Sequence, residues 1–452
     1  MKNIKEIIIM GCGPAGLAAG YHLARKGIRP CLFDKDTSVG GLSKTVHWKG
    51  NKFNLGEHRF YTKYPEVLKL WKNILPRDLK TEKCVSRTYY NNKFLEYKNL
   101  YKNLGFNKTI LCFLSYAKTR VSRRKSEETF EELITNRFGR KFFEIFFKDY
   151  IEKTWGLPCG KLSPERRTQG IKDFPLITAI KNSFENISPS LEKAPEIKTA
   201  ITEPLYPKKG PGQLYEKIAD YIKKRGGKIS LNTELKEIEI SENRITKAIL
   251  NDTEYSPGEF ISSIPLNHFI GSIASLIPQT VRDAAKKLKF RNLLKVVLIY
   301  NKKGLFPDNW IYINNSNVKV ARIQNFNNWP KVMTVDRNST MLGLEYFCGK
   351  NDDIWNSTDN ELINLGLEDL EKLNLAKADF FSDGIVYRVS DAYPIDSIGY
   401  KENLKVVREY LDNISNLHLA GRAGTFGYDN MSYSVMTGIR SAKNILAGKK
   451  GI

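Results

Sequence analysis

Three glycines near the start of the chain have the spacing of a phosphate-binding turn. The segment "KEIIIMGCGPAG" (residues 5–16) runs from a short apolar stretch into Gly11, Gly13 and Gly16. In this spacing the first glycine permits a tight turn, the second lets the backbone approach a pyrophosphate, and the third allows close packing of helix on strand. A helix beginning near Pro14, with Ala15 in its first turn, would point unpaired N–H groups at the phosphates.

An acidic residue follows at the distance that a dinucleotide site requires. The segment "PCLFD" (30–34) is typical of a second buried strand, and Asp34 lies 18 residues after Gly16. A carboxylate at this position can accept hydrogen bonds from a ribose diol. The strand, glycine turn, helix and acid together predict dinucleotide binding, with Lys35 beside Asp34 in the same site.

Three further blocks carry glycines and polar residues. The block "VGGLSKT" (39–45) places Gly41, Leu42 and Ser43 where they can line a pyrophosphate from the other side. The block "FNLGEHRFYTK" (53–63) holds Gly56, His58 and Arg59, and "HLAGRAGTFGYDNMSYSVMTGIRSAKNIL" ends the chain.

Together these blocks resemble the FAD-dependent amine-oxidase-type superfamily. That group includes protoporphyrinogen oxidase-like and phytoene desaturase-like flavoproteins and the UDP-galactopyranose mutases. The resemblance covers the first 65 residues, the segments "YPKKGPGQL" and "ISSIPL", and the last 35 residues. It implies an α/β fold in which a Rossmann-like FAD-binding domain is interleaved with a mixed α/β substrate domain.

The resemblance also implies roles for residues far from the first glycine turn. Gly421 and Arg422 would run beside the pyrophosphate of FAD, and Leu235 would lie where the adenine-binding strand passes. A helix starting at Met431, with Asn430 and Ser432 beside its start, would aim its N-terminus at the N1/O2 edge of the flavin. A helix dipole in this orientation stabilises the negative charge of a reduced flavin.

His58 and Arg59 are the candidate catalytic residues, although the flavin N5 itself would do the chemistry. The resemblance puts their loop near the flavin face, where Arg59 is suited to a substrate phosphate. The alternative is that His58 is a hydrogen-bonded loop residue and Arg59 a structural ion pair. The remaining histidines have no metal-ligand spacing and are interpreted as structural, so no metal site is predicted.

The middle of the chain is expected to supply the substrate pocket. Five residues there could hold an anionic substrate or stack on it: Trp155, Arg322, Tyr346, Arg388 and Tyr393. The alternative for any one of them is an ordinary position on a sheet face.

Two reaction classes fit these residues. In the first, an FAD-dependent oxidoreductase moves a hydride between a substrate C–H and flavin N5, with an anionic substrate that is lipid- or nucleotide-linked. In the second, a flavin-dependent sugar-nucleotide mutase of polysaccharide biosynthesis, similar to UDP-galactopyranose mutase, uses the reduced flavin as a nucleophile. A non-enzymatic flavoprotein or a membrane-docked interaction protein is the remaining alternative.

Periodicity predicts the elements that position these residues. Helices are expected over 14–27, 126–155, 213–225, 359–373 and 431–447, and strands over 5–10, 30–34, 258–266 and much of 294–348. Residues 228–250 alternate with period two, as short antiparallel strands do. We expect the FAD domain to comprise 1–80, 205–265 and 385–452, and the substrate domain 81–204 and 266–384.

Charge and cysteine content bound the partners and the compartment. The net charge is +23, and residues 97–125 hold eight Lys or Arg and no acid around an apolar stretch. This segment is either a solvated basic face on a core helix or a surface that contacts anionic lipid. No nucleic-acid motif accompanies the charge. Six scattered cysteines favour a reducing cytoplasm, with peripheral contact at the inner membrane face as a second hypothesis.

Overall fold

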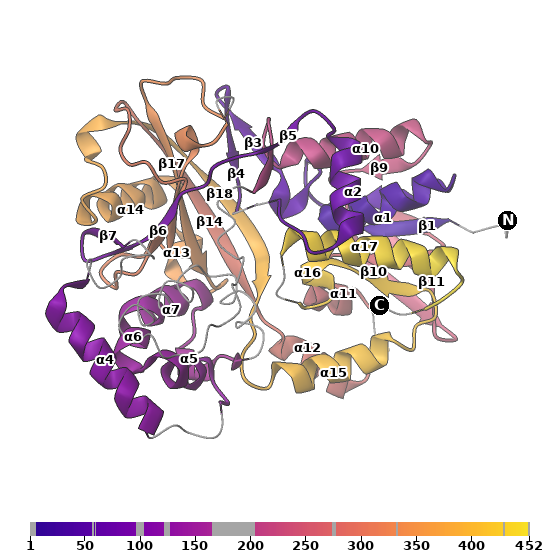
Figure 1. Cartoon of the computed structure of the whole chain (residues 1–452). Coiled ribbons are helices and arrows are strands. Elements are labelled where there is room, and N and C mark those ends of the chain that lie inside the picture. Colours follow the sequence, from indigo (N-terminus) through magenta and orange to yellow (C-terminus); the bar gives the residue numbers. More distant parts are fainter. Residues whose placement is uncertain are drawn as a thin grey trace.

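The computed structural model describes residues 6–56, 58, 60–95, 104–121, 127–164, 204–273, 277–330, 333–427 and 430–450. Arg59 and the ends of the basic segment, 97–103 and 122–125, lie outside these residues. Figure 1 shows two halves side by side, one built on a parallel sheet and the other on a larger mixed sheet. Within the described residues, no helix is long and apolar enough to cross a membrane.

A five-stranded parallel sheet forms the core of the first half. Its strands, in spatial order, are β19 (Leu417–Leu419), β13 (Glu259–Ser262), β1 (Ile7–Met10), β2 (Cys31–Phe33) and β9 (Lys228–Ser230). All four residues of β1 are buried, and alternate side chains pack on opposite faces of the sheet. A strand covered on both faces has to be apolar throughout, which explains the run before the glycines.

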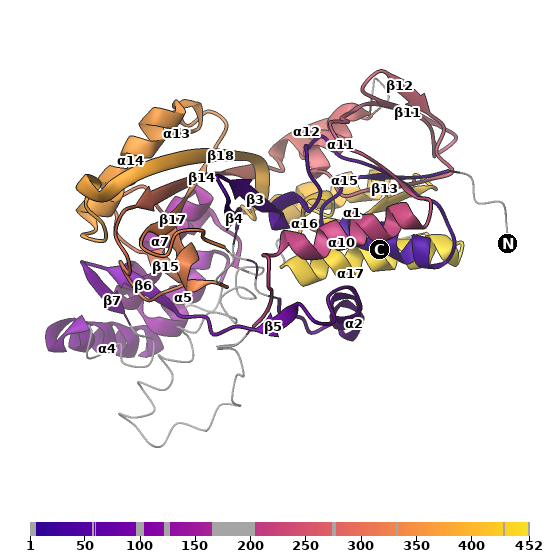
Figure 2. The same ribbon diagram turned by 90° about the horizontal axis from the view of Figure 1, so that it is seen from above.

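Helices cover both faces of this sheet. One face carries α1 (Pro14–Arg25), α2 (Pro65–Ile74), α10 (Gly212–Lys224) and α17 (Met431–Leu446). The other face carries α11 (Leu266–Ser272), α12 (Gln279–Lys287) and α15 (Tyr400–Leu411), together with the antiparallel sheet of β10 (Leu235–Ser241), β11 (Arg244–Leu250) and β12 (Thr253–Tyr255). The first, the middle and the last parts of the chain therefore share one core (Figure 2).

One strand pairs differently from the sequence-based expectation. Lys228–Ser230 was expected to be part of a run of antiparallel strands, but β9 pairs in parallel with β2 at the edge of the first sheet. Only β10, β11 and β12 form the antiparallel set. Period-two alternation indicates a strand with one solvated face, and an edge strand of a parallel sheet meets that condition as well.

A seven-stranded mixed sheet forms the core of the second half. Its order is β18 (Phe381–Pro394), β14 (Phe290–Tyr300), β17 (Thr340–Cys348), β16 (Arg322–Asn325), β15 (Trp310–Ile313), β6 (Ser86–Tyr90) and β7 (Lys93–Leu95). Helices α13 (Asp353–Asn356) and α14 (Asp359–Lys372) lie on one face (Figure 1). Two small antiparallel pairs, β3 (Thr45–Trp48) with β4 (Asn51–Asn54) and β5 (Leu79–Thr81) with β8 (Leu205–Pro207), complete the strands.

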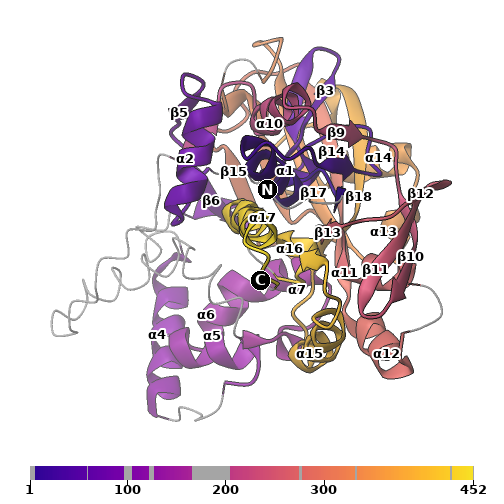
Figure 3. The same cartoon turned by 90° about the vertical axis from the view of Figure 1, so that its right-hand side faces the viewer.

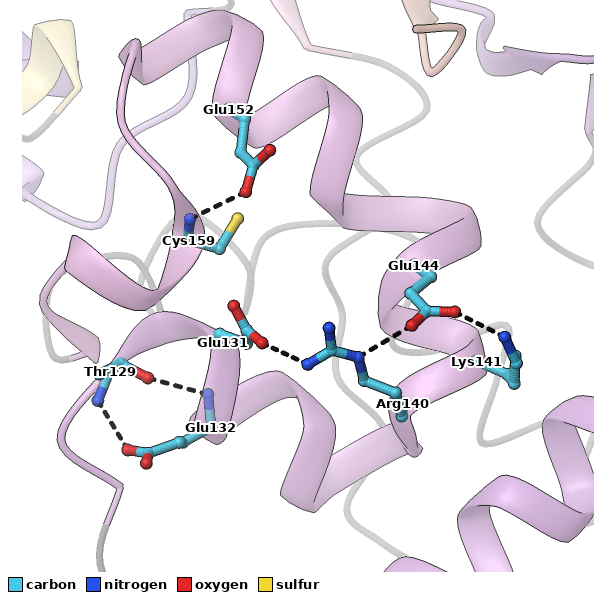
Figure 4. Close-up of polar contacts among 8 residues, drawn as sticks. All are labelled: Thr129, Glu131, Glu132, Arg140, Lys141, Glu144, Glu152 and Cys159. Carbon is cyan, nitrogen blue, oxygen red and sulfur yellow. Dashed lines mark hydrogen bonds and ion pairs between the residues drawn. The ribbon is translucent and has the colours of Figure 1, made fainter.

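A cluster of helices extends from the second sheet at the edge of the molecule. It comprises α4 (Phe106–Val121), α5 (Phe130–Phe138), α6 (Arg140–Phe143) and α7 (Asp149–Trp155), with a π-helical turn at Glu144–Lys148 between the last two. A reciprocal pair of hydrogen bonds between Thr129 and Glu132 caps α5 (Figure 4). Arg140 bridges Glu131 and Glu144, and Glu152 accepts from the Cys159 N–H, so these turns are held together by side chains (Figure 4).

The expected domain limits remain a prediction. Two of these limits fall within packed parts of the structure. Residue 385 lies inside β18, and helices α11 and α12, which follow residue 265, pack on the first sheet. The third and the last chain crossings between the two halves are therefore made by continuous packed elements.

Candidate functional site

A large cavity of about 1580 Å³ lies where the two halves meet. It opens at the carboxyl ends of the parallel strands, where α/β folds of this kind bind ligands. Most of the predicted site residues line it: Gly11, Gly13, Ala15, Asp34, Lys35, Gly41, Leu42, Ser43, His58, Leu235, Gly421, Arg422, Asn430, Met431, Ser432, Trp155, Arg322, Arg388 and Tyr393. Gly16, Gly56 and Tyr346 lie outside the lining, and Arg59 is outside the described residues.

The glycine turn has the geometry that its spacing predicted. Gly11 has a φ of +100°, a left-handed conformation that favours glycine. A Cβ on Gly16 would lie 1.8 Å from the Gly11 carbonyl oxygen, so this glycine lets α1 pack directly on the turn. Gly13 is the N-cap of α1 and offers no capping side chain, so the first N–H groups of the helix are directed at the cavity.

Two helix starts, one from each end of the chain, meet at this cavity. A Cβ on Gly438 in α17 would lie 2.0 Å from the carbonyl oxygen of Ala15 in α1, so the two helices cross backbone against backbone. Gly421, with a φ of +74°, donates its N–H to the hydroxyl oxygen of Thr437 in α17 at 2.8 Å. The side chain of Asn430 caps α17 by accepting the N–H of Tyr433 at 3.1 Å. The starts of α1 and α17 therefore lie close together at the cavity.

Asp34 is held rigidly by the backbone around it. Its Oδ2 accepts the N–H of Cys12 at 2.6 Å, and its Oδ1 accepts the N–H of Asp36 at 2.9 Å. Burial raises the pKa of Asp34, and these two hydrogen bonds oppose the rise. Each carboxylate oxygen has a second lone pair, so the group can still accept a hydroxyl. Leu235, at the start of β10, lines the cavity beside it.

The loop that carries His58 is fixed against the segment that follows the glycine pair Gly40 and Gly41. The ring Nε2 lies 2.6 Å from the Leu42 carbonyl oxygen, which can only accept, so Nε2 carries the hydrogen. Nδ1 lies 3.4 Å from the Ser43 hydroxyl. A Cβ on Gly56 would lie 3.3 Å from His58 Nε2, so this glycine makes room for the ring. His58 is therefore a hydrogen-bonded loop residue, as one of the two interpretations held, and it also lines the cavity.

The second sheet contributes a buried row of charges. Lys295, Glu345 and Arg322 stand in register on three neighbouring strands, β14, β17 and β16. Lys295 Nζ lies 2.9 Å from Glu345 Oε1, and Arg322 Nη2 lies 2.5 Å from Glu345 Oε2. Burial alone would raise the pKa of Glu345, but the charges of Arg322 and Lys295 outweigh it and hold the pKa below its usual value.

Arg322 is the member of this row that reaches the cavity. The side chains of Lys295 and Glu345 are fully buried, whereas that of Arg322 is 11% exposed and lines the cavity. The Arg322 guanidinium also lies over the rings of Trp310 and Phe347, at 5.2 and 4.9 Å from their centroids. Aromatic rings and a carboxylate thus orient one cation toward the cavity.

An aromatic wall stands between this cation and the first half. Trp155 and Tyr393 meet edge to face with their centroids 6.4 Å apart. Arg422 lies over the Tyr393 ring at 4.4 Å and donates to the carbonyl of Ala392 at 3.1 Å. The predicted Trp155, Tyr393 and Arg422 are therefore brought together, and they join the two halves across the cavity.

Two predicted substrate residues are corrected by the structure. Tyr346 is 1% exposed and packs with Leu342 and Leu344 on the α14 face of the sheet, away from the cavity. Arg388 borders the cavity, but its guanidinium donates to Asp359 of α14 at 2.5 Å and to the Ser357 carbonyl at 2.6 Å. Neighbouring residues of a strand point to opposite faces, and both side chains fall on the far face.

Several charged groups in or behind the cavity wall were missed or interpreted otherwise from the sequence. Lys295 and Glu345 are single charges within apolar strands, "LLKVVLIY" and "LGLEYF", and that interruption is a signal for a buried ion pair. His268 was interpreted as structural, yet it lines the cavity with Asp391, 2.9 Å from His268 Nε2. Lys350 pairs with the same carboxylate at 3.1 Å, and the contacts of Asp391 with His268 and Lys350 outweigh burial and lower its pKa.

Comparison with known proteins gives a family and a fold. The sequence model of the family described as flavin containing amine oxidoreductase matches residues 14–446. A 4,4'-diapophytoene desaturase (4,4'-diapolycopene-forming) of Methylomonas is 26% identical over 55% of this chain and 51% of its own length. A 15-cis-phytoene desaturase of Capsicum annuum is 24% identical over 81% of this chain and 64% of its own length. The chain thus spans between half and two thirds of these relatives.

Solved structures match over nearly the whole chain. A reduced UDP-galactopyranose mutase has a TM-score of 0.82 at 20% identity, covering 98% of this chain and 94% of its own. A proposed protoporphyrinogen oxidase of Exiguobacterium has a TM-score of 0.76 at 16% identity, covering 98% and 99%. At these identities the likeness establishes the fold, and the predicted α/β class is confirmed.

Proposed function

Because the chain belongs to the flavin containing amine oxidoreductase family, a class of flavin-dependent enzymes, we propose that it is an FAD-dependent oxidoreductase acting on an anionic substrate. The observation that carries the substrate class is the position of Arg322, whose guanidinium lines the cavity while Glu345 and two aromatic rings hold it in place. An anionic substrate group placed beside Arg322 would gain charge-assisted hydrogen bonds from this guanidinium.

The residues present fit the dinucleotide form of the flavin. The start of α1 and the facing glycines leave a cradle for a pyrophosphate, because a Cβ on Gly41 would lie 3.2 Å from Gly13 Cα and close it. Asp34 would accept a ribose hydroxyl, Leu235 would line the adenine position, and the starts of α16 (Gly421–Gly424) and α17 would face the ring. A bound flavin supplies a hydride acceptor or, when reduced, a nucleophile.

The chain's own residues would bind and orient the substrate. Arg322 would pair with its anionic group, and the Trp155–Tyr393 wall would exclude water from the reacting carbon. The ring of His58, held by the Leu42 carbonyl and the Ser43 hydroxyl, fixes this loop beside the pair Gly40 and Gly41. Catalysis in this arrangement rests on positioning and on a dry, positively biased cavity.

A sugar-nucleotide mutase is the second candidate, and one observation favours it. Tyr150 and Tyr312 both line the cavity, edge to face at 5.6 Å, and Tyr312 pairs directly with Arg322 across β15 and β16. A guanidinium next to Tyr312, with Tyr150 beyond it, suits a nucleoside diphosphate, which offers several acceptor oxygens.

Anaerobic spectroscopy of the flavin-loaded protein distinguishes the two candidates. For the oxidoreductase, we expect a redox substrate to bleach the oxidised flavin, whereas UDP-sugars cause neither bleaching nor turnover. Turnover of a UDP-sugar only after reduction with dithionite would assign the mutase instead. A purified protein that neither carries nor binds FAD would overturn both assignments.

Arg322→Ala tests the anion subsite with Arg388→Ala as its matched control. We expect Arg322→Ala to weaken binding of UDP, used as a probe of the subsite, by about tenfold or more, since a charged hydrogen bond contributes about 1.5–3 kcal/mol. Arg388→Ala should bind UDP as the parent does, because that guanidinium faces α14. Titration of flavin fluorescence gives the dissociation constants. Equal effects of the two substitutions, or none from Arg322→Ala, would remove Arg322 from the site.

A further inference from the structure

Helix α4 presents its apolar side chains to solvent. The exposed fractions are 39% for Ile110, 52% for Leu111, 46% for Phe113, 58% for Leu114 and 92% for Val121. Ile110, Leu111, Leu114 and Val121 follow the three- and four-residue spacing of one helix face, and Phe113 flanks them. We call these five residues the α4 apolar face. An amphipathic helix on the surface of a globular protein normally packs its apolar side on the core. Helix α4 instead turns its apolar side to solvent.

The opposite side of α4 explains why the helix is docked in this way. That side is built of small or polar residues, of which Cys112 is buried. The Ser115 hydroxyl accepts the N–H of Lys141 at 3.1 Å. A Cβ on Gly139 would lie 2.7 Å from the Tyr116 nitrogen, so α4 crosses the turn between α5 and α6 backbone against backbone. The contacts that fix α4 thus use its polar side and leave the α4 apolar face outward.

Cations surround this face. The described part of the helix carries Lys108, Lys118 and Arg120 and no acidic residue, and the wider segment 97–125 holds eight Lys or Arg without an acid. Two acids of the helices beneath, Glu131 and Glu144, pair with Arg140 and Lys141 (Figure 4). Helix α4 lies at the outer edge of the molecule in all three views (Figure 3).

We propose that α4 docks the protein on the surface of a bilayer containing anionic lipids, with the α4 apolar face entering the headgroup–acyl boundary. Apolar side chains ringed by Lys and Arg on a helix lying in the interface plane are the pattern of such binding. A second copy of the chain fits less well, because it would bring two basic segments together on molecules of net charge +23. The proposal does not depend on the reaction in the cavity.

Flotation with vesicles of stated composition tests the apolar contribution. We expect the full chain to float with vesicles of phosphatidylcholine and phosphatidylglycerol, and the pair Leu111→Ser with Leu114→Ser to reduce the partition coefficient by about tenfold or more. The matched control is Val335→Ser with Ile398→Ser, two residues 67% and 56% exposed elsewhere, which should float as the parent does. Unchanged thermal melting of both pairs establishes that they are folded.

A second pair of substitutions tests the contribution of charge to vesicle binding. Lys118→Gln with Arg120→Gln should weaken flotation with the anionic vesicles on the order of tenfold, and vesicles of phosphatidylcholine alone should bind the parent more weakly. Leu114→Trp should show a blue shift of fluorescence when anionic vesicles are added, since the ring would enter the bilayer boundary. Absence of parental flotation, equal flotation of the Leu pair, or an unshifted Trp would overturn the proposal. So would a dimer in vesicle-free buffer that the Leu pair dissociates, which would assign this face to a second copy.

Discussion

Lys153 is a buried lysine that links the helix cluster to the second sheet. It lies in α7 between residues that line the cavity, and its Nζ donates to the carbonyl oxygens of Asn315 at 2.9 Å and Val320 at 3.1 Å. Burial lowers its pKa to about 8 from an ordinary 10.5, although Asp369 and Asp149 oppose the shift. The group ties α7, and with it Tyr150 and Trp155, to the loop beyond β15.

The lowered pKa predicts a pH dependence of stability. Between pH 8 and 10.5 the unfolded chain binds this proton and the folded chain has lost it, so this lysine makes stability rise with pH, by up to about 3 kcal/mol. The free energy of unfolding of the parent, relative to Lys153→Met, should therefore increase from pH 7.5 to pH 10 in urea titrations. Lys286→Met, at a side chain 75% exposed, corrects for loss of a surface charge. A pH-independent difference would mean that Lys153 is not desolvated as described.

At the scale of elements, the crossing of α1 and α17 decides whether the two chain ends form one site. Gly438→Ala would place a methyl group 2.0 Å from the Ala15 carbonyl oxygen, so the helices would have to separate. We expect a loss of about 1–3 kcal/mol of stability, typical of overpacking, and a smaller flavin content after purification. The ratio of flavin to protein absorbance and urea unfolding measure the two effects.

The control for this substitution is another glycine with room for a methyl group. At Gly160 the nearest atom to an added Cβ is Glu131 Oε2 at 3.6 Å, an ordinary contact, so Gly160→Ala should retain flavin and stability. If Gly438→Ala retained both as well, the close crossing would not be what holds the cofactor cradle together.

Elements whose local signals agree with their packing could be predicted from the sequence. The strand, glycine turn and helix of residues 7–25 and the closing helix Met431–Leu446 combine period, glycines and caps that all favour one structure. The pairing of β9 could not be predicted, because an alternating pattern does not say which neighbour a strand will find.

The substrate side could be predicted only in part, because the face of a strand depends on register. Arg322 and Tyr393 reach the cavity, whereas Tyr346 and Arg388 fall on the α14 face. The alternation of the two faces along β17 was visible in the sequence. Tyr346 shares its face with Leu342 and Leu344, whereas Glu345 points to the other face and pairs with Arg322. Which of the two faces lines the cavity depends on how the two halves of the molecule pack together, and the strand pattern alone does not give this.

At the scale of the whole molecule, the cavity is where distant parts of the chain are joined. Its wall takes residues from the first glycine turn, from the antiparallel sheet near Leu235, from the mixed sheet and from the starts of α16 and α17. A ligand that contacts all of these stabilises the folded chain by binding it and not the unfolded chain, by about 4 kcal/mol at a thousandfold excess over its dissociation constant. Its loss should therefore loosen these segments together.

Hydrogen exchange of the flavin-free and FAD-loaded protein tests this coupling. Removal of FAD should speed amide exchange at residues 11–16, 40–43, 421–427 and 430–434, while α14, which packs on the far face of the second sheet, should exchange as before. FMN lacks the adenylate half, so adding it should leave the amides of Cys12 and Asp36, which donate to Asp34, unprotected, whereas FAD should restore them. Protection confined to the N-terminal segment, or equal protection by FMN and FAD, would show that the chain ends do not share one dinucleotide.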